Sequence, residues 1–107
     1  MIYKFKSKAG ADVIMLGPQG DRILQLLGRE PGAQGIVQTD QLGAAIATLE
    51  QAVAADEEKF AKLQAEAKAA GEPVPRREGV SLRQRVWPLI ELMRHAVKAG
   101  DDVIWGA

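Results

Sequence analysis

The 107-residue chain contains no cysteine and a single histidine. The lack of cysteine excludes thiol catalysis, disulfide bonds and every cysteine-ligated zinc or iron–sulfur site. The 14 basic and 14 acidic residues cancel, so no global field favours nucleic acid or an anionic membrane. No apolar run approaches the roughly 18 residues that cross a bilayer, and the opening MIYKFKSKAG lacks the apolar core of a signal peptide. We therefore expect a cytoplasmic protein with no membrane partner.

The composition that is present, 47% hydrophobic and 26% charged residues, is typical of a folded protein, and the length suits one domain over residues 1–107. In residues 1–17, Tyr3 and Phe5 alternate with lysines, which predicts the first strand of a β-hairpin with one buried face. The uninterrupted apolar run in DVIML predicts the return strand. Because lysines suit the edge of a sheet, we expect the first strand at the edge and the second nearer the centre.

The rest of the chain is predicted to be mostly helical. Proline and glycine bracket a short helix in GPQGDRILQLLG, and a proline-free stretch rich in Ala, Leu, Glu, Gln and Lys predicts a long one. The spacing of SLRQ is that of a capping box at the start of the last helix. The expected elements are a short helix at 18–28, a long helix at 40–70, a linker at 72–80, a helix at 81–99 and a strand at 101–106.

The sequence leaves two local features of secondary structure undecided. The loop REPGAQGIVQ contains two glycines and a proline, and leaves room for at most a short extended piece at Ile36 and Val37. The apolar spacing of the long helix lapses at Asp56, so the segment is either one helix or two helices with a break there.

These elements define an α+β fold of order ββααα β, with a small three-stranded, mainly antiparallel sheet and helices on one of its faces. A helix over residues 40–70 would run on the order of 45 Å, whereas strands of five or six residues span roughly 20 Å. The long helix must therefore extend beyond the sheet, and we expect the last helix to run back along it as a long helical hairpin.

The stretch RQRVWPLIELMRHAVKAG places Pro88 inside the last helix, where it cannot donate to the carbonyl of Gln84. This predicts a kink or a break near Trp87. We expect Trp87 to be largely buried, as a wedge where the bent helix meets its neighbours, and His95 to lie near the surface.

The two ends of the chain, MIYKFKSKAGADVIML and SLRQRVWPLIELMRHAVKAGDDVIWG, resemble a family of short bacterial proteins known as domain of unknown function 1840. The combination of a YKFKS opening, an SLRQR-x-WP helix start and an IWG ending is specific, and the resemblance covers most of the chain. It implies a compact cytoplasmic domain, and it implies no activity, cofactor or catalytic residue.

Two patterns suggest a ligand site, and each has a simpler interpretation. The segment VIMLGPQGDRILQ joins a strand to a helix N-terminus, which suits phosphate, but Asp21 in the first turn would repel an anion. Glu91 and His95 stand one helical turn apart like half of a metal site, but no cysteine or second histidine completes the ligand set. His95 also lacks a nucleophile placed beside it. We therefore expect no metal, no cofactor and no catalytic residue.

The hypothesis that remains is association. An amphipathic helix that extends past a small sheet, and the free edges of that sheet, pair readily with another chain. We expect a non-catalytic protein-interaction or assembly module, with an unknown protein or a second copy as partner. The alternative is a weak nucleic-acid-binding protein that uses residues 76–98, where six basic residues face two acidic ones, although solvated faces and helix–helix ion pairs explain these charges more simply. The candidate interaction surface comprises Lys4, Lys6, Arg76, Arg77, Arg83, Arg85, Trp87 and Arg94.

Overall fold

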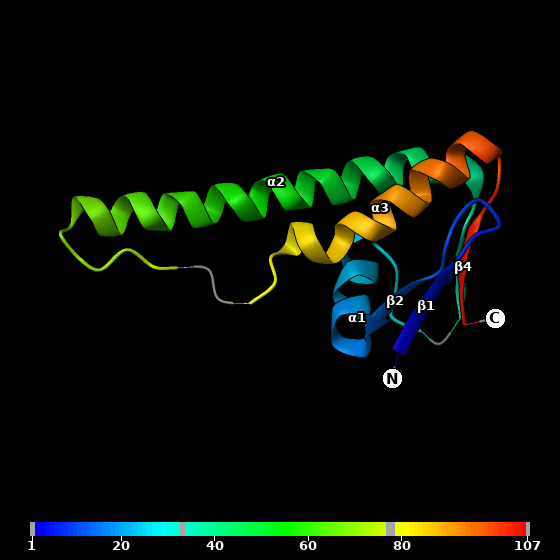
Figure 1. Cartoon of the computed structure of the whole chain (residues 1–107), viewed down its shortest axis with the longest axis horizontal. Helices are drawn as coiled ribbons and strands as arrows, with labels where there is room; N and C mark the ends of the chain where they lie inside the picture. The colour runs from blue at the N-terminus through cyan, green and yellow to red at the C-terminus, as the bar shows by residue number, and fades with distance from the viewer. Residues whose placement is uncertain (1, 33, 77–78, 107) are drawn as a thin grey trace.

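The computed structural model describes residues 2–32, 34–76 and 79–106 as an α+β fold with three helices and a four-stranded sheet. Figure 1 shows the sheet and the shortest helix at one end of an elongated molecule, and the longest helix running out beyond them. The elements in chain order are β1 (Ile2–Lys6), β2 (Val13–Leu16), α1 (Gly17–Leu26), β3 (Gly35–Val37), α2 (Thr39–Ala69), α3 (Leu82–Ala99) and β4 (Val103–Trp105).

The sheet is antiparallel with the strand order β2-β1-β4-β3. The prediction of three strands was wrong, because β3 adds a fourth. This strand is only three residues long and pairs with β4 in a register that sets Ile36 opposite Ile104. The short extended piece considered at Ile36 and Val37 lies in this strand, but three residues beside glycines and a proline cannot show the alternation that identifies a strand.

The expected positions of the first two strands were also wrong, because β1 lies inside the sheet and β2 lies at its edge. Tyr3 and Phe5 are buried on the face that the helices cover, whereas Lys4 is exposed on the opposite face. A lysine side chain that extends into solvent from the uncovered face of an interior strand is not buried, so its charge is not desolvated. The alternating lysines therefore indicate which face of the sheet is exposed to solvent, and they do not indicate that the strand lies at the edge.

The core lies between the covered face of the sheet and the helices. The rings of Tyr3 and Phe5 stack with their centroids 6.0 Å apart, and the ring of Trp105 lies 5.7 Å from that of Phe5. Helix α1 crosses close above this row at Gly20, where an added Cβ would come within 2.0 Å of the Tyr3 ring. The helix can approach the strand this closely because Gly20 has no side chain.

Helix α2 is a single 31-residue helix, so the alternative of a break near Asp56 is not found. Its first half contributes four residues to the core and packs along α3, whereas Leu63 in its second half is 48% exposed. The two helices lie side by side in Figure 1 and form the expected hairpin, with α2 extending past the start of α3.

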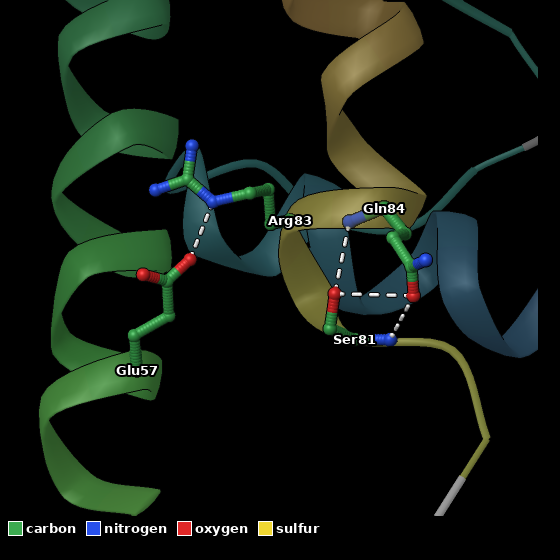
Figure 2. A network of polar contacts seen from close by, with 4 residues as sticks. All are labelled: Glu57, Ser81, Arg83 and Gln84. Carbon is green, nitrogen blue, oxygen red and sulfur yellow. Dashed lines mark hydrogen bonds and ion pairs between the residues drawn. The ribbon is translucent and has the colours of Figure 1, made fainter. Parts of the chain in front are cut away.

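Helix α3 begins with the predicted capping box. The hydroxyl of Ser81 accepts from the backbone N–H of Gln84, and the Gln84 side chain accepts from the backbone N–H of Ser81, as Figure 2 shows. The helix continues through Pro88 without the break that was considered, and a bend at this position stays a prediction. Gly100 then ends the helix with a φ of 66°.

Two adjacent carboxylates tie the end of α3 to distant parts of the chain. Asp101 accepts hydrogen bonds from the Ser7 hydroxyl and the Lys8 backbone N–H, both at 2.8 Å. Asp102 accepts from the backbone N–H of Thr39, also at 2.8 Å, and so satisfies a free donor in the first turn of α2. The hairpin turn and the start of the longest helix are both held by the segment that leads into β4.

Candidate interaction surface

Trp87 is 39% exposed, which corrects the prediction that it would be largely buried. The core face of α3 contains seven other residues, Leu82, Val86, Leu89, Ile90, Leu92, Met93 and Ala96. One residue along an α-helix turns about 100°, so the residue after Val86 lies at the margin of that face. The periodicity of apolar residues predicted the buried face of α3. It could not determine whether the large ring of Trp87, at the margin of that face, would be buried.

Two arginine side chains lie against the exposed indole. The guanidinium carbon of Arg83 is 5.6 Å from the centre of the Trp87 ring, and that of Arg94 is 5.1 Å away. Both distances are within the range of a cation–π interaction. Arg83 lies one turn before Trp87 and Arg94 about two turns after it, so the ring is flanked from both directions along α3.

Each arginine is also held by carboxylates. Arg83 donates from Nε to Glu57 on α2 at 2.5 Å, and Figure 2 shows its side chain reaching across from α3. Arg94 donates to Glu50 on α2 at 2.7 Å and to Glu91 on α3 at 2.8 Å. The hydrogen bonds to Glu57 and Glu50 are the main reasons that the pKa values of Arg83 and Arg94 are raised. Each guanidinium group is thereby paired with at least one carboxylate while it lies near the ring.

We call this group of six residues the Trp87 surface: Glu50, Glu57, Arg83, Trp87, Glu91 and Arg94. Two hollows open on it. The first, of about 200 Å³, lies between α2 and α3 and has Val53 and Ile90 among its lining residues. The second, of about 370 Å³, is lined by Arg83, Gln84, Trp87 and Pro88. The surface therefore combines a large aromatic ring, one hollow of mixed polarity, one mainly apolar hollow and a rim of paired charges.

The structure brings together three of the eight residues predicted for an interaction surface, namely Arg83, Trp87 and Arg94. Lys4 and Lys6 lie on the sheet instead, where Nζ of Lys4 is 3.8 Å from Oδ2 of Asp12. Arg85 is half-buried and lines neither hollow.

The last two members of the predicted set lie in the linker between α2 and α3. Arg76 is exposed there, and Arg77 falls outside the described residues. Of the basic residues predicted at 76–98, the described ones therefore lie on α3, except Arg76 in the linker.

Sequence reasoning favoured helix–helix ion pairs, which are present, but it did not identify Glu50 and Glu57 as the partners of the two arginines, although a signal existed. Glu50 and Glu57 are seven residues apart and Arg83 and Arg94 are eleven apart, so each pair lies on one side of its helix. Two antiparallel helices with acids on one stripe and bases on the other are expected to pair through them. A count of charges over a chain segment does not show which of them share a helix face.

Within residues 2–32, 34–76 and 79–106, no group of three His, Asp or Glu side chains is placed to hold a metal ion. His95 is exposed, as predicted. Asp21 accepts a hydrogen bond from the Tyr3 hydroxyl at the start of α1. No helix in the described part of the chain is long and apolar enough to cross a membrane.

Fold and surface together define a small α+β protein with a helical hairpin that presents an aromatic surface rimmed by ion pairs. The chain belongs to the family described as domain of unknown function (DUF1840), whose model matches residues 1–105. The resemblance read from the two ends of the sequence is thus confirmed. No curated protein and no solved structure matches the chain. Because the family description contains no activity, function has to be argued from the surface itself.

Proposed function

We propose that the protein is a non-catalytic interaction module that binds a polypeptide partner through the Trp87 surface. The observation that carries this proposal is the 39% exposed indole of Trp87, held between two ion-paired arginines. Exposing part of a tryptophan to water forgoes stabilisation that full burial would give. Tryptophan and arginine are also the residue types in which the binding energy of protein interfaces is concentrated.

The shape of the surface suggests what the partner presents. The hollow beside Trp87 and Pro88 is lined by two apolar rings and by the side chains of Arg83 and Gln84, which suits an apolar or aromatic side chain. Trp87 is 39% exposed, and we infer that a carbonyl of the partner accepts a hydrogen bond from its indole N–H. We therefore infer a partner segment with an apolar side chain flanked by uncharged polar groups.

The charges of the surface favour a polypeptide over a nucleic acid. Three carboxylates surround two guanidinium groups, so the Trp87 surface has no excess of positive charge. A phosphate would have to displace Glu57 or Glu50 from its arginine before it could bind. Lys4 and Lys6 lie on the sheet and add no positive charge at this place.

The test is affinity capture from the native cell with the full-length tagged chain, followed by mass spectrometry and binding of the purified partner. We expect Trp87→Ala to abolish recovery of one protein that Ile36→Ala still recovers, because Ile36 is a comparably exposed apolar residue on the distant sheet. The purified partner should bind the wild type and the control with equal affinity, and Trp87→Ala at least about tenfold more weakly. Equal binding by all three chains contradicts the proposal.

A parallel measurement addresses the nucleic-acid alternative. We expect labelled RNA and DNA to show no mobility shift at micromolar protein concentration. A salt-sensitive shift that Arg83→Ala and Arg94→Ala both remove would overturn the polypeptide proposal and favour the alternative.

A further inference from the structure

Apart from its short length, the edge of the sheet formed by β2 lacks the features that prevent edge-to-edge pairing. Its four residues, VIML, include no charge and no proline. Among the described residues, β2 pairs with β1 and with no other strand. Natural sheets protect such an edge with lysine, proline, a bulge or a covering segment, because an unpaired row of N–H and C=O groups is a template for another strand.

The side chains next to this edge are apolar and exposed. Ile14 and Leu16 on β2 are 64% and 61% exposed, and Ile2, which lies opposite Leu16 on β1, is 64% exposed. The three residues form a patch on the face of the sheet that no described helix covers. The opposite edge is different, because β3 has only three residues and its single outward side chain, Ile36, is 40% exposed.

We propose that the β2 edge pairs with the β2 edge of a second copy of this chain, as an antiparallel pair about a two-fold axis. The pair would join the two sheets into one sheet of eight strands. It would also merge the patches of Ile2, Ile14 and Leu16 from both copies into one apolar strip. This inference uses a surface distant from Trp87 and does not depend on the proposed function.

The geometry of a strand limits the register of such a pair. A two-fold axis perpendicular to the sheet sets outward residues opposite outward residues, because side chains alternate between faces with a period of two. The register must therefore be centred on a residue and not between two residues. If the two-fold axis passes by Met15, Ile14 of each copy lies opposite Leu16 of the other copy. If the axis passes by Ile14, the carboxylate of Asp12 lies opposite Leu16.

The Met15 register also explains why a second copy is the occupant. The strand is its own complement, since each Ile14 meets a Leu16 and no like charges face each other across the pair. Asp12 would lie opposite Pro18 at the start of α1, outside the strand. Helix α1 does not obstruct the edge, because Gly20 places it above the Tyr3 ring on the covered face.

Sedimentation measurements from micromolar to millimolar concentration test the proposal. We expect the wild type to approach twice its 11.5 kDa mass, and Leu16→Lys to weaken association at least about tenfold by placing an unpaired charge in the apolar strip. Ile14→Lys is a second variant with the same expectation. Ile36→Lys is the matched control, with an equal charge on the same face away from the β2 edge, and should associate like the wild type.

Three results would overturn the proposal: a wild type that remains monomeric throughout, a β2 variant that remains dimeric, or a control as impaired as Leu16→Lys. The third result would indicate packing of sheet faces instead of edges. Circular dichroism verifies that each variant is folded, and both β2 positions are exposed enough to accept lysine.

The register can be tested separately because the chain has no native cysteine. Chains with Ile14→Cys and chains with Leu16→Cys should form a mixed disulfide faster together than either forms a disulfide alone, since these positions face each other. Faster cross-linking of Ile14→Cys alone would contradict the Met15 register. Equally slow cross-linking of all three samples would contradict pairing through β2, and would leave a foreign strand as the occupant of this edge.

Discussion

The hydroxyl of Tyr3 on β1 donates a hydrogen bond to a carboxylate oxygen of Asp21 on α1. Tyr3 is 2% exposed and is the only tyrosine of the chain. The bond joins the first strand to the first helix at the point where Gly20 allows the two to approach. It is also the main reason that the pKa of Tyr3 is raised above its ordinary value of 10.0.

A spectroscopic titration of tyrosinate should show this shift directly. We expect a midpoint above 10.0 in the wild type, and a midpoint closer to 10.0 in Asp21→Asn, because the carboxylate that favours the protonated hydroxyl is gone. The stabilisation from this bond is fully present below the pKa of the unfolded state. It is lost as pH rises through the higher folded-state pKa. The same midpoint in both proteins would contradict the role of Asp21.

Two glycine-to-alanine substitutions should change stability in opposite directions. Gly20→Ala forces a methyl group into the Tyr3 ring and should lower the free energy of unfolding by about 1–3 kcal/mol. Gly43→Ala, in α2, meets nothing within 4 Å and should raise it by about 0.5–1 kcal/mol through helix propensity. Urea unfolding measures both. A neutral Gly20→Ala would mean that α1 does not lie as close to β1 as described.

The network at Asp101 should make the protein sensitive to acid. Hydrogen bonds from the Ser7 hydroxyl and the Lys8 N–H lower the pKa of Asp101 below its ordinary value of 3.8. The resulting stabilisation is present above 3.8 and is lost as pH falls through the lower folded-state value. We expect stability to fall less over this range in Asp101→Asn than in the wild type, as measured by denaturant unfolding at a series of pH values. Identical pH profiles would contradict the assignment.

The two tryptophans should differ in accessibility. Trp105 is 3% exposed and its indole N–H donates to the Gly32 carbonyl, whereas Trp87 is 39% exposed. We expect Trp87→Phe to remove most of the fluorescence that acrylamide quenches, and to change stability by less than about 1 kcal/mol. Trp105→Phe should cost more than about 1 kcal/mol, because it leaves a cavity beside Phe5. Weak quenching of both residues would contradict the exposure of Trp87 and the function proposed from it.

The parts of the fold that the sequence predicted are those with local signals. The capping box of Ser81 and Gln84 lies within four residues, and the alternation of Tyr3 and Phe5 with lysines within seven. The family resemblance also came from local motifs. The order of the strands has no such signal, because β4 inserts between β1 and β3 from the other end of the chain.

The candidate site was predictable in its members on α3 but not in its arrangement. Three of its four members on α3, namely Arg83, Trp87 and Arg94, were in the predicted set, although Trp87 was expected to be largely buried. Whether the ring is covered depends on how α2 packs, and on Glu50 and Glu57, which hold the arginines against the indole. That information lies in the relation between two helices and not in either one alone.

The interior position of β4 sets an order in which the sheet can assemble. The β1–β2 hairpin needs only neighbouring residues, but the sole sheet neighbour described for β3 is β4, more than 60 residues away in sequence. Such non-local pairing slows folding, because the chain loses the entropy of closing a long loop before the stabilising contacts between the strands can form. A chain shortened at residue 100 would thus be expected to lose β3 together with β4, along with the Asp102 carboxylate that holds the first turn of α2.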